Sequence, residues 1–160
     1  RPLYYEPFVG FVSPDHRLYK KEFISEQDLD INDILLLEDG HCFKNSIINL
    51  CQSSSNIDKI QFQLESGSIK TLIKLSKDGL GMTLIPYLHT LDLSEDDHKY
   101  LKQFNNTVPA REVSLIYHKS QLKMQMIEAL KTTIDGVIRG AISFQDVKII
   151  SPLNKKKELK

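Results

Sequence analysis

The sequence has 160 residues, is 41% hydrophobic and balances 21 basic residues against 21 acidic ones. This hydrophobic fraction is sufficient for a core, and the neutral charge argues against a nucleic-acid-binding surface here, since such surfaces are basic. No apolar run approaches the roughly 18 to 20 residues that span a bilayer. Two cysteines are too few for the disulfide framework of a secreted domain, so we expect a reducing, cytoplasmic compartment.

In chain order, the hydrophobic pattern predicts strands that alternate with helices. Strands are expected at residues 6–12, 34–37, 59–64, 82–85 and 113–117, with a short terminal strand within 142–150. Helical segments are expected after Ser25, at 42–51, from Ser68 to Asp78, after Ser94 and at 121–138. This alternation predicts an α/β domain with a largely parallel sheet.

Both cysteines belong to one segment, which begins after an acidic turn with a glycine. Phe43, Ile47 and Ile48 have helical spacing between Cys42 and Cys51. A thiol at a helix start meets unpaired N–H groups and the positive end of the dipole, which favour the thiolate, so Cys42 is placed to be reactive.

The spacing of the two cysteines allows two states of the segment. On one unbroken helix their Cα atoms would lie about 13 Å apart along the axis, whereas a disulfide tolerates at most about 7 Å. The pair can therefore be helical or bonded but not both, as a redox switch requires. The alternative is two unrelated buried cysteines in a reduced protein.

Four stretches resemble the peroxide-sensing regulators of the LysR family of bacterial transcription factors. They are Glu38-Asp39-Gly40-His41-Cys42 with Cys51 nine residues later, Ser68-Ile69-Lys70-Thr71-Leu72, Gly79-Leu80-Gly81-Met82-Thr83-Leu84-Ile85-Pro86, and Arg111-Glu112-Val113-Ser114-Leu115-Ile116-Tyr117. The resemblance implies a two-lobed, periplasmic-binding-protein-like regulatory domain. It also implies a transcription regulator and not an enzyme.

The family's layout implies one complete lobe and one partial lobe. Residues 1–12 would be a strand of lobe I, 13–110 lobe II with the redox cysteines, 111–142 the return strand and helix of lobe I, and 143–160 a solvated tail. A winged helix-turn-helix outside this sequence would bind DNA. The other implied partners are RNA polymerase, a second copy in a dimer or tetramer, and a thiol reductant such as glutaredoxin or thioredoxin.

The resemblance also implies a peroxide site. Cys42 would attack hydrogen peroxide and Cys51 would resolve the resulting sulfenic acid as a disulfide. His41, the backbone N–H groups after Gly40, and Arg111 would stabilise the leaving hydroxide. The family carries an acid three residues after the reactive cysteine, and this sequence has Asn45, which can hydrogen-bond but cannot take a proton.

A second candidate site lies at the start of the helix that follows Ser68. Ser68 and Thr71 would bind an anion in the cleft between the lobes, although such residues are often only helix caps. No cofactor or metal is expected, because the cysteines and histidines lack the close paired spacing of zinc sites. Two other interpretations stay open: a LysR-type effector domain that binds a small organic acid, with incidental cysteines, and a thiol peroxidase.

Overall fold

The computed structural model describes residues 1–38, 42–51, 64–105, 107–118, 120, 123–142 and 147–150. Strand β1 (Pro2–Phe11) is central to its main sheet, in which the order is β2-β6-β1-β7-β8 and β5 also pairs with β1. The other strands are β2 (Phe23–Ile24), β5 (Thr83–Pro86), β6 (Leu101–Phe104), β7 (Val108–Ser114) and β8 (Val147–Ile149). A separate two-stranded sheet contains β3 (Leu36–Leu37) and β4 (Glu65–Ser66).

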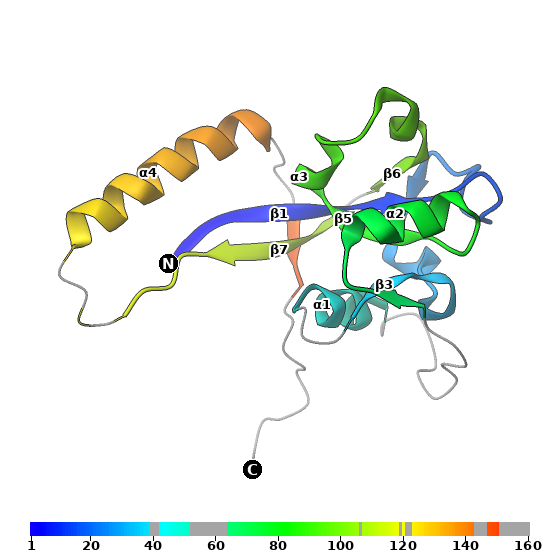
Figure 1. Cartoon of the computed structure of the whole chain (residues 1–160), viewed down its shortest axis with the longest axis horizontal. Coiled ribbons are helices and arrows are strands. Elements are labelled where there is room, and N and C mark those ends of the chain that lie inside the picture. The colour runs from blue at the N-terminus through cyan, green and yellow to red at the C-terminus, as the bar shows by residue number, and fades with distance from the viewer. Residues whose placement is uncertain are drawn as a thin grey trace, which may run out of the picture.

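Strand β1 changes partners along its length. Its first half pairs with β7, from Pro2 opposite Ser114 to Pro7 opposite Ala110, and its second half pairs with β5 and β6. Figure 1 shows the consequence: β1 and β7 form a long ribbon that leads from the α4 side of the molecule into the body containing α1, α2 and β3.

The α/β composition is as predicted, but the prediction of a largely parallel sheet is wrong. β1 is antiparallel to β5, β6 and β7, whereas the pairs β2–β6, β7–β8 and β3–β4 are parallel. The prediction assumed that each strand pairs with the next one through a helical crossover. β1 instead takes partners from much later in the chain, which local alternation of strands and helices does not reveal.

The helices are α1 (Cys42–Cys51), α2 (Ile69–Lys77), α3 (Tyr87–Thr90) and α4 (Met124–Ala141), with 3₁₀ turns η1 (Glu26–Asp28), η2 (Ile31–Asp33) and η4 (Glu95–Tyr100). The capping residues read from the sequence correctly predicted the start of η1 and both ends of α2. The Asp28 carboxylate accepts hydrogen bonds from the Ser25 N–H and hydroxyl, both at 2.9 Å. α2 begins after Ser68 and is followed by Gly79 with a φ of +84°, which favours glycine. None of the helices formed by the described residues is long and apolar enough to cross a membrane.

Several strands begin or end at other residues than the sequence predicted. The first strand begins at Pro2 and not at residue 6, and the strand expected at 113–117 is β7, which ends at Ser114. Pairing with β1 extends β7 back to Ala110, and pairing with β8 extends it to Val108. The strand expected at 59–64 and the tail at 151–160 lie outside the described residues.

One core joins α1 to the sheets. Phe43, Ile47, Leu50 and Cys51 are each 1–4% exposed and belong to the cluster that contains Phe8 and residues of β3. α4 stands apart from this body in Figure 1, and its apolar residues Met126, Leu130 and Val137 are 50–67% exposed. The cysteine helix is therefore part of the core of the body, and α4 is not.

Candidate functional site

The cysteine segment is one continuous helix. α1 begins at Cys42 and ends at Cys51, which places their Cα atoms about 13 Å apart along the helix axis. This is the helical state that the spacing predicted, and a disulfide is not compatible with it. His41, Gly40 and the side chain of Cys42 lie outside the described part of the chain, so their roles stay predictions.

Cys51 is the last residue of this helix and is buried. Its side chain is 1% exposed. Burial, followed by the negative charges of Asp33 and Asp30, raises the pKa of the Cys51 thiol to about 12. A thiol with such a pKa is protonated at neutral pH and is a poor nucleophile. In the helical state Cys51 is therefore a buried thiol of low reactivity.

A cleft of about 430 Å³ opens beside the first turn of α1. The cleft is lined by Leu37, Phe43, Gly67, Ser68, Ile69, Lys70, His89, Asp92 and Arg111. The lining thus includes the start of α2 and both acidic and basic side chains. Ser68 and Arg111 therefore line the same cleft. Thr71 and Asn45 are exposed and are not among the lining residues.

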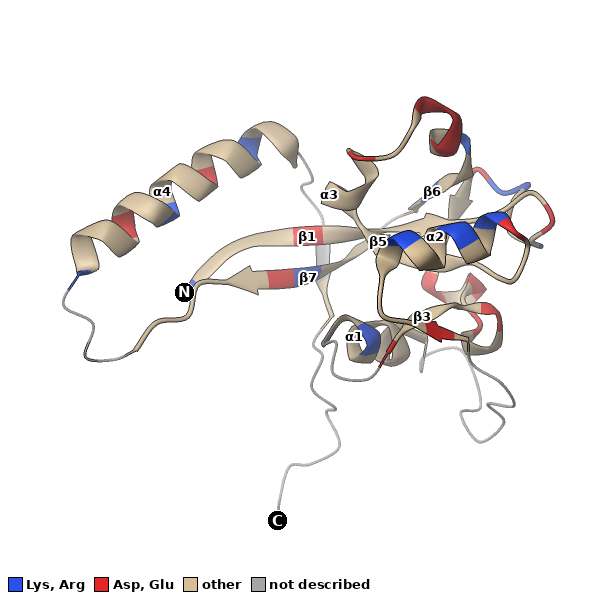
Figure 2. Cartoon of the chain, viewed as in Figure 1, with Lys and Arg blue, Asp and Glu red and all other residues tan. Residues whose placement is uncertain are grey.

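Arg111 is held in place by a buried carboxylate. Its guanidinium donates to Oε2 of Glu6 through Nε at 3.0 Å and through a terminal nitrogen at 2.8 Å. Glu6 is 1% exposed, and its other oxygen accepts from the Leu88 N–H at 3.0 Å. Figure 2 shows these opposite charges side by side in the middle of the β1–β7 ribbon. Part of the Arg111 charge is therefore already compensated before any anion enters the cleft.

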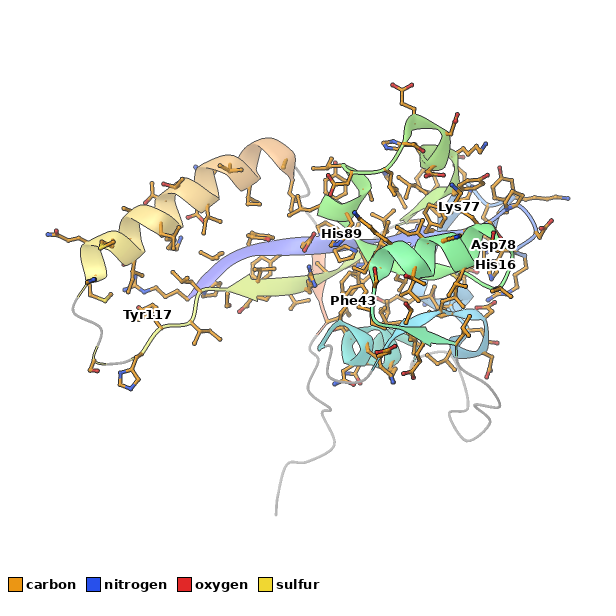
Figure 3. All side chains as sticks on the ribbon, in the orientation of Figure 1. His16, Phe43, Lys77, Asp78, His89 and Tyr117 are labelled. Atoms are coloured by element: carbon orange, nitrogen blue, oxygen red, sulfur yellow. The ribbon has the colours of Figure 1, made fainter. Side chains whose placement is uncertain are left out.

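Phe43 connects the cysteine helix to this ion pair. The Arg111 guanidinium lies 5.5 Å from the centre of the Phe43 ring, and Phe43 packs edge-on against Phe8 of β1, with ring centres 5.2 Å apart. Figure 3 shows Phe43 between α1 and the ribbon. Phe43 also lines the cleft and is the second residue of α1, so the cysteine helix itself contributes a side chain to the cleft.

Sequence reasoning did not single out Glu6, Phe43, His89 or Asp92 as site residues. Glu6 carried a usable signal, because it precedes the apolar run of Pro7, Phe8 and Val9, and an acid beside such a run is buried only when it is paired. The other three reach the cleft through contacts between segments that are far apart in the chain, and they carry no local signal.

The chain is similar to known transcription regulators. It is 28% identical over 139 residues to the DNA-binding transcriptional dual regulator OxyR of Escherichia coli K12, across 84% of this chain and 45% of that protein. It is 33% identical over 98 residues to the HTH-type transcriptional regulator EstR of Acinetobacter baylyi, across 60% of this chain and 32% of that protein. The chain thus spans less than half the length of these relatives.

Solved structures of OxyR share its fold. The structure of OxyR from Porphyromonas gingivalis superposes with a TM-score of 0.78 at 25% identity and covers 94% of this chain and 69% of that one. A reduced form of OxyR from Neisseria meningitidis gives a TM-score of 0.71 at 26% identity, over 91% of this chain and 66% of that one. The family model of the LysR substrate binding domain matches residues 1–137 of this chain. The chain therefore belongs to the LysR substrate-binding-domain family.

Proposed function

We propose that this chain is the redox-sensing regulatory part of a LysR-type transcription regulator that responds to hydrogen peroxide by a reversible disulfide between Cys42 and Cys51. The observation that carries the proposal is the position of the two cysteines at opposite ends of one helix, in a fold shared with OxyR structures. The curated relatives named as hydrogen peroxide-inducible genes activators support the same stimulus.

The chemistry uses the contrast between the two thiols. The Cys42 thiolate attacks one peroxide oxygen, the O–O bond breaks, and the leaving hydroxide takes a proton to become water. Cys51 then attacks the Cys42 sulfenic acid, which releases a second water and forms the disulfide. Peroxide thus accepts two electrons from two thiols. A dithiol reductant of the glutaredoxin or thioredoxin kind returns the electrons and restores the helix.

Arg111 and the polar groups near Gly40 and His41 assist the first step in this proposal, by stabilising the negative charge that develops on the leaving oxygen. Asn45 offers a hydrogen bond but no proton. The ribbon of β1 and β7 is then the crossover between a partial lobe I and a complete lobe II, divided at residues 12 and 110. Rebuilding of α1 would alter dimer or tetramer geometry in the cytoplasm and so change the contacts with DNA and RNA polymerase.

The test is thiol trapping on the full chain after exposure to hydrogen peroxide. We expect the unmodified sequence to lose both free thiols, the Cys51→Ser variant to accumulate a sulfenic acid on Cys42, and the Cys42→Ser variant to accumulate none. If Cys51 is oxidised in the Cys42→Ser variant while Cys42 stays reduced in the Cys51→Ser variant, the roles are reversed. If peroxide leaves both thiols intact, the proposal fails.

A second candidate function rests on the cleft. Its lining by Ser68 and Lys70 at the start of α2 and by Arg111 of β7 suits a small organic acid, as in an effector-binding LysR-type domain with incidental cysteines. The test is titration with a series of small carboxylates, monitored by the chemical shifts of Ser68 and Arg111. The second candidate function predicts binding that does not depend on the cysteines, which separates it from the first.

A further inference from the structure

A buried lysine lies between the two cysteines, and the peroxide chemistry makes no use of it. Lys44 is the third residue of α1 and is 8% exposed. Its ammonium group lies 2.6 Å from Oε1 of Glu65. Lysine is rarely buried to this extent unless it is paired, and the contact with Glu65 offsets part of the cost of burying this ammonium group.

Glu65 lies outside α1, in the two-stranded sheet of β3 and β4. It is the first residue of β4 and pairs in parallel with Leu36 of β3, which is fully buried. The Leu36 N–H donates to the Leu64 carbonyl at 3.2 Å and fixes the backbone just before Glu65. The ion pair thus connects the first turn of α1 to the β3–β4 sheet.

This connection belongs to the state in which α1 is helical at Lys44. Formation of the Cys42–Cys51 disulfide requires the segment between them to be rebuilt, and Lys44 lies inside it. We propose that the Lys44–Glu65 ion pair is a latch that positions α1 in its helical, dithiol state and thereby sets how readily the disulfide forms. This inference rests on the proposed redox function and adds a pair of positioning residues to it.

The latch predicts the direction of a change in reduction potential. The Glu65→Gln variant removes the carboxylate charge beside a buried ammonium group in the dithiol state, whereas rebuilding of the segment in the disulfide state lets Lys44 reach water. The variant therefore destabilises the dithiol state relative to the disulfide. Because the Glu65 side chain is 28% exposed, we expect a moderate effect of about tenfold in the equilibrium constant for oxidation, which corresponds to about 30 mV toward more negative potential for a two-electron couple.

The experiment is equilibration of the full chain in glutathione buffers of graded redox poise, followed by acid quenching and counting of free thiols. In this equilibrium glutathione disulfide accepts the two electrons, becomes two glutathiones and leaves a protein disulfide. Circular dichroism of the reduced variants checks that they are folded. If Glu65→Gln does not fold, Glu65→Asp replaces it, because the shorter side chain withdraws the charge from Lys44, and the same direction is expected.

Two further variants separate the latch from general effects of charge. Asp97→Asn breaks the ion pair of Lys77 and Asp97, which has the same 2.6 Å length but lies on α2 and η4, and it should leave the potential unchanged. The exchange of Lys44→Glu with Glu65→Lys restores an ion pair with inverted charges and should return the potential toward its original value. If the potential responded only to the charge near Cys42, the exchange would shift the reduction potential more than Glu65→Gln does, because it places a negative charge at position 44.

The outcomes distinguish this inference from the proposed function. If the unmodified chain forms no disulfide in any buffer, the redox function fails and the latch fails with it. If the disulfide forms but Glu65→Gln leaves the potential unchanged, or Asp97→Asn shifts it equally, the latch alone is wrong. A shift of about tenfold confined to Glu65→Gln and reversed by the exchange supports it.

Discussion

Glu6 and Arg111 are register partners in the antiparallel ladder of β1 and β7, and two guanidinium nitrogens of Arg111 donate to one carboxylate oxygen of Glu6, at 3.0 and 2.8 Å. The two residues lie 105 positions apart in the chain. Their ion pair links the two strands of the ribbon. Glu6 also accepts a hydrogen bond from Leu88 of α3, and Arg111 lies over the Phe43 ring and lines the cleft.

Loss of the Glu6 charge should destabilise the fold. We expect Glu6→Gln to lower the free energy of unfolding by about 2 kcal/mol, less than the roughly 3–5 kcal/mol of a fully buried pair, because Arg111 is 30% exposed. Urea unfolding measures this. The control is Glu112→Gln, on the exposed face of the same ladder, which should change stability by less than about 0.5 kcal/mol. Equal effects of the two variants would contradict the assigned role of Glu6.

Truncation of Phe43 should cost more than truncation of its half-buried neighbour on α1. Phe43→Ala removes the contacts with Phe8 and Arg111 and leaves a cavity in the core, so we expect a loss of about 3 kcal/mol in unfolding free energy. Ile48→Ala, on the half-buried side of the same helix, should cost about 1 kcal/mol. The same urea titrations compare them. Similar losses would mean that Phe43 does not anchor the helix to the ribbon.

The buried thiol predicts a decline of stability at alkaline pH. The pKa of Cys51 is about 12 in the folded chain and near its ordinary value of 9 in the unfolded chain. Above pH 9 the unfolded chain therefore loses a proton that the folded chain keeps, so the free energy of unfolding falls with pH by up to about 1.4 kcal/mol per unit. This contribution is fully present below pH 9.

The measurement is the pH dependence of unfolding free energy under reducing conditions, with Cys51→Ala as the comparison. The variant should start from a lower stability at pH 7, because it leaves a small cavity, but should decline less steeply between pH 9 and 11. Other groups contribute to both slopes, including Tyr4, whose pKa is also raised by burial, so the difference between the two curves is the relevant quantity. Parallel curves would show that Cys51 is not the titrating group.

Oxidation should remodel α1 and leave the sheets intact. In the reduced chain the backbone amides of α1 are protected by helical hydrogen bonds, and a disulfide requires at least part of the helix to unwind. Hydrogen exchange should therefore become faster between Cys42 and Cys51 after peroxide treatment. Protection should persist in β1 and β5, whose residues Phe8, Phe11, Leu84 and Ile85 are at most 1% exposed. Unchanged protection in α1 after disulfide formation would remove the basis of the switch.

The sequence by itself determined the local elements on which the site depends. Helical spacing and the acidic turn before Cys42 predicted α1, and the Ser68 cap with Gly79 beyond the last turn predicted α2, because caps and periodicity act between residues a few positions apart. The separation of Cys42 and Cys51 on one helix followed from the rise per residue alone. Boundaries of strands were less well predicted, since β7 gains its first residues only from pairing with β1 and β8.

The tertiary structure decided which of these local elements touch. The pairing of Glu6 with Arg111, the position of Phe43 under Arg111 and the ion pair of Lys44 with Glu65 each join segments separated by at least 20 residues. No local pattern specifies such contacts, because they depend on strand order and register, which are set by burial of the whole core. Lys44 shows the difference most clearly: nothing in the residues around it signals burial, and only the packing of α1 into the core makes it buried and paired with Glu65.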